Sequence, residues 1–219
     1  MNKEQSVIEF YVLCNTLKNI VRTGWKDWGV TRERIESIAE HIYGVQMLAI
    51  SMWSQYGYDL DIKKVLSMLA LHELEETIIG DLTQFQIDRN TKTQIGHEAI
   101  HKILNKLAQG HPLEQLILEF DERTTPEAQF AYQCDKLECD LQCKIYDEEN
   151  CVDLNNQSSN PTAQDKQVKD LLDSGLSWSE MWITFDQQKN HYDKNFLAVS
   201  NYAITHNLHN NENELSESK

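Results

Sequence analysis

Apolar residues recur every three or four positions along most of this 219-residue chain, which is the spacing of amphipathic helices. Only 8 glycines and 3 prolines are available to interrupt the pattern, and no segment predicts a strand. We therefore predict an all-α fold. The expected helices cover residues 5–21, 37–56, 59 or 61 to 79, 91–109, 126–149 and 177–204.

Short signals mark several of the helix starts. Ser37 with Glu40, and Ser177 with Glu180, have the spacing of capping boxes, in which side chains satisfy the free backbone N–H groups of a first turn. Pro126 suits the first position of a helix, where its missing N–H is not needed. These signals support long helices joined by short connections.

The stretch 71–81, LHELEETIIGD, places a histidine and three glutamates where a buried helix would carry leucines. On a projection at about 100° per residue, His72 and Glu76 fall within about 60° of Leu69, inside the apolar sector. We expect the helix to end at Gly80. Buried carboxylates cost free energy unless a partner compensates them, and a cation is the first candidate.

A solvated stripe is the ordinary interpretation of an acidic run. That interpretation is weak here because Leu71 and Leu74 occupy the opposite side, so the whole segment is expected to be buried. Among these acids, a solvated position is expected for Glu75 alone. The start of HELEE also matches the zinc-protease pattern H-E-x-x-H, but Glu76 stands where that pattern needs its second histidine.

His41 also lies on an apolar face, with Val45 and Leu48 one and two turns further on. A single histidine on such a face is usually a hydrogen-bonded core residue. Two of them, from two helices and with a carboxylate beside one, favour a metal site instead. Imidazole nitrogens together with carboxylate oxygens suit Mn, Co, Ni, Fe or Zn.

The composition of the chain restricts the classes of partner that the protein is expected to bind. The formal net charge of −15 repels phosphate backbones, so we expect no long nucleic acid, whereas a small nucleotide remains compatible with a local cation. No apolar run reaches transmembrane length and the first residues lack a signal-peptide pattern, so we expect no membrane partner. Five cysteines without a CxxC pair indicate reduced thiols and a cytoplasmic location.

Two weaker patterns are interpreted as structural. Cys139 and Cys143 lie one helical turn apart, and packing is favoured over metal binding. His97 and His101 have the same spacing, and a surface pair is favoured over a second metal site.

Five segments in order, RTGW, GV, ESIAEH, HE…E…GD and TPEAQF…QCDKLE, make the chain resemble the HD-domain metal-dependent phosphohydrolases. It is most similar to the branch with bacterial 5′-deoxynucleotidases and eukaryotic HD-domain-containing protein 2. The resemblance covers about residues 5–150 and implies a single-domain helical bundle there. We expect residues 151–205 to form additional helices packed on this core, and residues 206–219 to form a polar flexible tail.

The family pattern H…HD…D implies four metal ligands, which match His41, His72, Glu73 and Asp135. Glu73 departs from the pattern, since the family has aspartate there. Glutamate keeps the charge and the oxygen ligands but is one methylene longer.

The resemblance also implies the residues that act on the substrate. Glu76 and Asp81 match family acids near the attacking water and the phosphate, and they are the expected catalytic residues. Arg22 and Trp25 match an arginine and a tryptophan near the sugar and phosphate. For Trp25, a role as a core anchor is the alternative.

The function implied by these matches is hydrolysis of a small phosphate ester, most specifically a 5′-nucleotidase reaction on (deoxy)nucleoside monophosphates. One divalent ion, Mn, Co, Ni, Fe, Zn or Mg, would be the cofactor, and a homodimer is expected because family members are often dimers. A catalytically weakened nucleotide- or metal-binding regulatory protein is the alternative, with Glu73 as its mark. A helical interaction protein without metal is the third interpretation.

Overall fold

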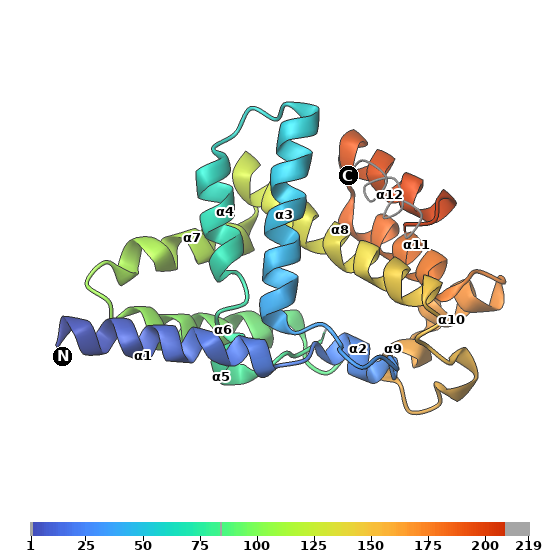
Figure 1. Ribbon diagram of the computed structural model, residues 1–219, viewed down its shortest axis with the longest axis horizontal. Coiled ribbons are helices and arrows are strands. Elements are labelled where there is room, and N and C mark those ends of the chain that lie inside the picture. The colour runs from blue at the N-terminus through green and yellow to red at the C-terminus, as the bar shows by residue number, and fades with distance from the viewer. Residues whose placement is uncertain (1, 84, 209–219) are drawn as a thin grey trace, which may run out of the picture. The chain divides into compact units, whose positions relative to one another are not determined.

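The computed structural model describes residues 2–83 and 85–208, and it is built from helices (Figure 1). Within these ranges there is no strand, only an isolated antiparallel bridge between Val21 and Ser37. The expected all-α fold is confirmed. The chain divides into two compact units, which are described one at a time: Met1–Lys26 with Ile35–Asp135, and Asp27–Arg34 with Lys136–Lys219.

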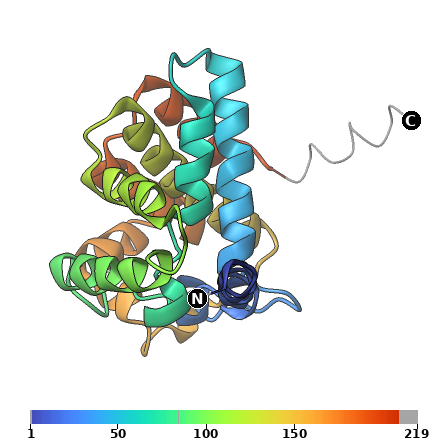
Figure 2. The same ribbon diagram turned by 90° about the vertical axis from the view of Figure 1, so that its left-hand side faces the viewer.

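The first unit contains most of the N-terminal helices. α3 and α4 run antiparallel and side by side in both views (Figures 1 and 2). The elements of this unit are α1 (Lys3–Asn15), η1 (Thr16–Asn19), α2 (Thr23–Asp27, whose last residue belongs to the second unit), α3 (Ile38–Tyr56), α4 (Ile62–Leu71), α5 (Glu76–Ile79), α6 (Arg89–Leu104), α7 (Gly110–Glu122) and the start of α8 (Pro126–Glu148).

One apolar cluster of this unit joins α6 and α7 to the acidic stretch. Its buried members are Leu74, Ile100, Ile103, Leu104 and Ile117, and Phe10 and Leu13 of α1 pack against them. Because Leu74 is 2% exposed and lies between Glu73 and Glu75, burial of this leucine fixes the backbone that carries the acids.

The structure confirms the helix-start signals. Both capping boxes are formed, by Ser37 with Glu40 and by Ser177 with Glu180. Asp61, rather than Asp59, is the N-cap of α4, since its side chain accepts from the backbone N–H groups two and three residues on.

The expected continuous helix from 61 to 79 is wrong. α4 ends at Leu71, residues 72–75 form turns, and α5 begins at Glu76. The ring of His72 provides the physical reason, because its Nδ1 lies 2.8 Å from the carbonyl oxygen of Leu69. In a continuous helix that oxygen would accept from the backbone N–H of Glu73.

Three other expected helices have different ends. The segment 5–21 is α1 followed by η1, and the segment 91–109 ends at Leu104. The segment 177–204 is two helices, because His191 adopts a left-handed conformation at φ 49° and Asp193 then caps a new helix. Such a φ ends a helix because the chain can no longer continue the hydrogen-bonded turns.

The second unit is held together by aromatic residues. Ring centroids of Trp28 and Trp178 lie 5.6 Å apart, and those of Trp178 and Trp182 lie 6.0 Å apart. These contacts tie residues 27–34 to the C-terminal helices. The elements of this unit are the remainder of α8, η2 (Leu154–Asn156), α9 (Pro161–Gln164), α10 (Lys166–Asp173), α11 (Trp178–Asn190) and α12 (Lys194–Thr205).

The expected core at 5–150 and extension at 151–205 stay predictions. The expected tail at 206–219 lies mostly in 209–219, outside the described residues. Within the described ranges, none of the helices has the length and apolar character needed to cross a membrane. All five cysteines are free thiols.

A buried carboxyl in the second unit predicts a pH dependence of stability. Asp140 is fully buried and its Oδ2 accepts from the Tyr192 hydroxyl at 2.9 Å. Burial first, and then the nearby Asp186 carboxylate, raise the pKa of Asp140 well above its usual range. The folded protein therefore keeps a proton that the unfolded chain releases near pH 4, so the free energy of unfolding falls as pH rises above about 4.

Asp140→Asn imitates the protonated carboxyl and keeps an oxygen that accepts from Tyr192. The variant is therefore expected to remove the fall in the free energy of unfolding that wild type shows as pH rises. Urea unfolding at pH 5 and pH 8 should show the variant gaining stability relative to wild type as pH rises. Asp173→Asn, at an exposed position of the same unit, is the control and should track wild type. An Asp140→Asn difference that is the same at both pH values would contradict the interpretation.

Candidate metal centre

The structure brings the four expected metal ligands of the first unit together. His41 comes from α3, His72 and Glu73 from the turn after α4, and Asp135 from α8. Each offers one ligand atom, and these four atoms all lie within 4.8 Å of one another. His41 Nε2 is 3.1 Å from Asp135 Oδ1, and His72 Nε2 is 3.8 Å from that same oxygen.

The donor set fits a divalent cation. His72 Nδ1 donates to a backbone carbonyl, which leaves the lone pair of the neutral ring on Nε2. That Nε2 atom is buried and has no hydrogen-bond partner in the described part of the chain. A buried nitrogen lone pair facing two carboxylates is the arrangement that a metal ion satisfies.

Glu73 reaches the centre in spite of its extra methylene. Its Oε1 lies 3.7 Å from Nε2 of both His41 and His72. Burial opposes ionisation, but the neighbouring His72, Lys92 and His41 side chains outweigh it, so the pKa of Glu73 lies below its usual range. The side chain is therefore a carboxylate, the form that binds metal.

Glu76 lies beside this centre and is 2% exposed. Its Oε1 is 3.3 Å from the ammonium of Lys92, whereas its Oε2 is buried without a hydrogen-bond partner among the described residues. Burial first, then the charges of Glu73 and Asp81, raise the pKa of Glu76 well above its usual range. An acid of this kind is a candidate for proton transfer.

Asp81 fixes the start of α2. Its Oδ2 accepts from the backbone N–H of Thr23 at 2.5 Å, and its carbonyl oxygen accepts from the Thr23 hydroxyl at 2.8 Å. The segment after Gly80 is thereby joined to the residue that follows Arg22.

Arg22 lies near Glu73 of the centre, and Trp25 is joined to Arg22 through Glu36. Arg22 Nη1 lies 4.0 Å from Glu73 Oε1, and Arg22 Nε lies 3.9 Å from Glu36 Oε2. The Trp25 ring is 1% exposed and its Nε1 donates to that same Glu36 oxygen at 2.8 Å. The burial of Trp25 agrees with the core-anchor alternative, and Glu36 joins this ring to Arg22.

Sequence reasoning did not single out Glu36 or Lys92. Glu36 precedes the capping serine within ESIAEH, where its neighbours already explain the pattern. Lys92 stands in the polar run RNTKTQ, which has the composition of a solvated helix start. The sequence around each residue resembles that around an ordinary surface charge, because its partner is brought to it only when the chain folds.

His97 and His101 lie against carboxylates of α7. His97 Nε2 is 2.7 Å from Asp121, and His101 Nδ1 is 3.1 Å from Glu114. These contacts agree with the favoured interpretation of surface side chains.

The fold and these side chains together define a class: helical proteins with a buried centre of two imidazoles and two carboxylates. Comparison with known families specifies the class further. A family model described as HD domain matches residues 14–174, and the chain belongs to this family.

Relatives carry names of one activity. The chain is 31% identical over 150 residues to the 5′-deoxynucleotidase HDDC2 of Dictyostelium discoideum, a match that covers 65% of this chain and 78% of the relative. It is 30% identical to the 5′-deoxynucleotidase hdd1 of Schizosaccharomyces pombe, with 66% and 74% covered. The human 5′-deoxynucleotidase HDDC2 is 27% identical, with 66% and 70% covered.

Solved structures share the fold. A conserved hypothetical protein from Pyrococcus furiosus is 26% identical with a TM-score of 0.56, and the match covers 70% of this chain and 87% of that protein. A predicted metal-dependent phosphohydrolase from Magnetospirillum magnetotacticum has a TM-score of 0.62 at 18% identity, with 93% and 91% covered, which shows the fold alone.

Proposed function

We propose that this protein is a metal-dependent phosphomonoester hydrolase that acts on (deoxy)nucleoside 5′-monophosphates. The observation that carries the proposal is the convergence of His41, His72, Glu73 and Asp135, with the His72 Nε2 lone pair directed at no protein donor among the described residues. The substrate class is supported by the relatives named 5′-deoxynucleotidases.

The residues around the centre supply distinct parts of such a reaction. A divalent cation, when bound by the four ligands, lowers the pKa of water and offsets phosphoryl charge. Glu76 is suited to orient the attacking water and accept its proton at Oε2. Arg22 presents a guanidinium, which can donate two parallel hydrogen bonds to a phosphate. Asp81 holds the backbone next to Arg22.

The net charge of −15 supports a small substrate over a long nucleic acid, because a local cation can reverse the field inside one pocket only. The free cysteines support a cytoplasmic location. The metal is one of Mn, Co, Ni, Fe, Zn or Mg, which the donor types accept to different degrees.

A panel assay tests the proposal. The purified protein, supplied in turn with each of these metals, is expected to release phosphate from nucleoside 5′-monophosphates. Deoxynucleotides and ribonucleotides with each base are compared, and a chelator is expected to stop the release. No phosphate from any nucleotide with any metal would remove the enzyme proposal.

A regulatory protein that has lost turnover is the second candidate, and Glu73 is the observation that favours it. Such a protein would bind nucleotide in calorimetry without releasing phosphate, and Glu73→Asp would raise its activity. Because Glu73 Oε1 already lies 3.7 Å from both imidazole nitrogens, we expect Glu73→Asp to lower metal affinity instead.

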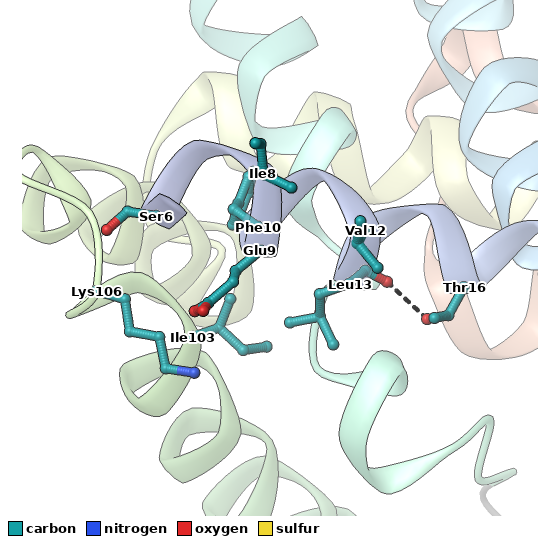
Figure 3. A pocket seen from close by; sticks show the side chains of 9 residues that line it. All are labelled: Ser6, Ile8, Glu9, Phe10, Val12, Leu13, Thr16, Ile103 and Lys106. Atoms are coloured by element: carbon teal, nitrogen blue, oxygen red, sulfur yellow. Dashed lines mark hydrogen bonds between the residues drawn. The ribbon is translucent and has the colours of Figure 1, made fainter. Parts of the chain in front are cut away.

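We propose that a second copy of this chain covers the exposed face of α1. Val7, Ile8, Tyr11 and Val12 are 56–65% exposed there. A groove of about 450 Å³ lies along α1, and Figure 3 shows the residues that line it, which include Ile8 and Val12 of α1 and Ile103 and Lys106 opposite them. The same apolar strip on each copy suits a two-fold contact.

Light scattering should report a dimer for wild type and a monomer for Ile8→Asp, and a wild-type monomer would overturn this assignment.

A further inference from the structure

Lys92, in the first turns of α6, is a cation that lies beside the acids of the site. Its Nζ donates to the carbonyl oxygen of Leu82 at 2.8 Å and lies 3.3 Å from Glu76 Oε1. Although burial lowers the pKa of Lys92, the charges of Glu73, Glu76, Glu75 and Asp81 raise it above its usual range. The side chain is therefore a permanent positive charge at this place.

The partner of Lys92 distinguishes this contact from an ordinary surface ion pair. The side chain of Lys92 is 30% exposed, whereas that of Glu76 is 2% exposed. A buried carboxylate is costly unless a counter-charge lies beside it, and an exposed pair between two solvated groups carries no such constraint. Lys92 is thus the counter-charge that lies against the buried Glu76 carboxyl and opposes the rise in its pKa.

The two oxygens of Glu76 have different surroundings. Oε1 is held by the ammonium, and Oε2 has no hydrogen-bond partner among the described residues. A carboxylate anchored through one oxygen has its rotation restricted, so the other oxygen stays in one place. That free oxygen is the one available to a water molecule.

The contact with Leu82 adds a second effect. Leu82 follows Asp81, in the segment that begins after Gly80 at φ 75°. Lys92 therefore joins α6 both to Glu76 and to the backbone beside Asp81. Through these two contacts, Lys92 fixes the position of Glu76 and of the backbone next to Asp81.

We propose that Lys92 is a positioning residue of this site, which holds the buried Glu76 side chain through Oε1 and leaves its Oε2 to act on water. This inference rests on the proposed phosphohydrolase function. Lys92 lies at hydrogen-bond distance from no expected metal ligand in the described structure, and its charge is one of several influences that keep the pKa of Glu73 low. Its loss should therefore affect metal binding much less than turnover.

Lys92→Met, which keeps the length of the side chain and removes its charge, tests the proposal. We expect kcat for phosphate release to fall by about 10- to 100-fold, because small displacements of a reacting group cost this much, while KM and the metal content stay close to wild type. Lys92→Arg keeps a cation and should restore part of the loss. Lys102→Met, at an exposed position of the same helix, is the matched control.

Wild-type kcat in Lys92→Met would overturn the proposal. Equal losses of kcat and bound metal would also overturn it, because they would assign Lys92 a general structural role. In a Glu76→Gln background, Lys92→Met should have a much smaller effect on kcat, since only its contact with the Leu82 carbonyl oxygen is then left to lose.

Thermal unfolding tests the contact between Lys92 and Glu76 without relying on turnover. If wild type releases no phosphate, the proposed function fails, but the contact can still be measured. Lys92→Met should lower the unfolding midpoint by about 4 °C in wild type and by clearly less in the Glu76→Gln background, where an amide replaces the carboxyl group that the ammonium contacts. The same loss in both backgrounds would show that Lys92 does not act through Glu76.

Discussion

His72→Ala is expected to abolish bound metal and phosphate release together. His72 supplies a buried Nε2 lone pair to the centre and has no hydrogen-bond partner there among the described residues, so no other group replaces it. Changes in residues that merely orient metal ligands cost about 10- to 100-fold in metal affinity, and removal of a ligand should cost more. Calorimetric metal titration and the nucleotide assay measure both effects.

His97→Ala is the matched control, because this histidine of the same unit lies against Asp121 instead of the centre. It should keep wild-type metal binding and turnover. Circular dichroism in the presence of a chelator checks that both variants fold. A His72→Ala protein that folds and still hydrolyses nucleotides at the wild-type rate would refute the assignment of this centre.

Glu76→Gln is expected to lower kcat by about 10²- to 10⁴-fold, which is the usual contribution of a positioned acid or base. Glutamine fills the same volume but cannot accept a proton at Oε2. Because Glu76 is not one of the four ligands, metal binding should remain close to wild type. Single-turnover assays with saturating metal separate this loss of chemistry from a loss of binding.

Glu75→Gln is the control for Glu76→Gln. Burial, and then the charge of Glu73, raise the pKa of Glu75 to about 8, so at neutral pH its carboxyl is already mostly uncharged. Glutamine imitates that form, and kcat should change little. Equal losses in the two variants would mean that general disturbance of this turn, and not proton transfer by Glu76, limits the reaction.

The sequence predicted the all-α fold class, which the structure confirms, and four candidate ligands, which the structure brings close together. His41 lies on the apolar face of α3 and His72 follows the last residue of α4, and both are buried, as their apolar neighbours in the sequence predict. The capping boxes at Ser37 and Ser177 are equally local, since each involves residues three apart. The positions of Glu73 and Asp135 depended on the family resemblance.

The sequence did not reveal two kinds of interaction. One is made by residues that are distant along the chain, and the other arises when a side chain competes with a backbone N–H for the same carbonyl oxygen. The break at His72 arises because a side chain takes the carbonyl of Leu69, and propensity alone does not weigh that contact. Glu36 and Lys92 are adjacent to Trp25 and Glu76 only in the folded chain. Their types and neighbours in the sequence are those of solvated charges.

Elemental analysis of the purified protein tests the central claim most directly, because it asks whether the four side chains hold a cation at all. The account predicts about one divalent metal ion per chain in wild type, and its loss in His72→Ala and in Asp135→Ala. A wild-type protein that contains no divalent metal and takes up none on reconstitution would contradict it.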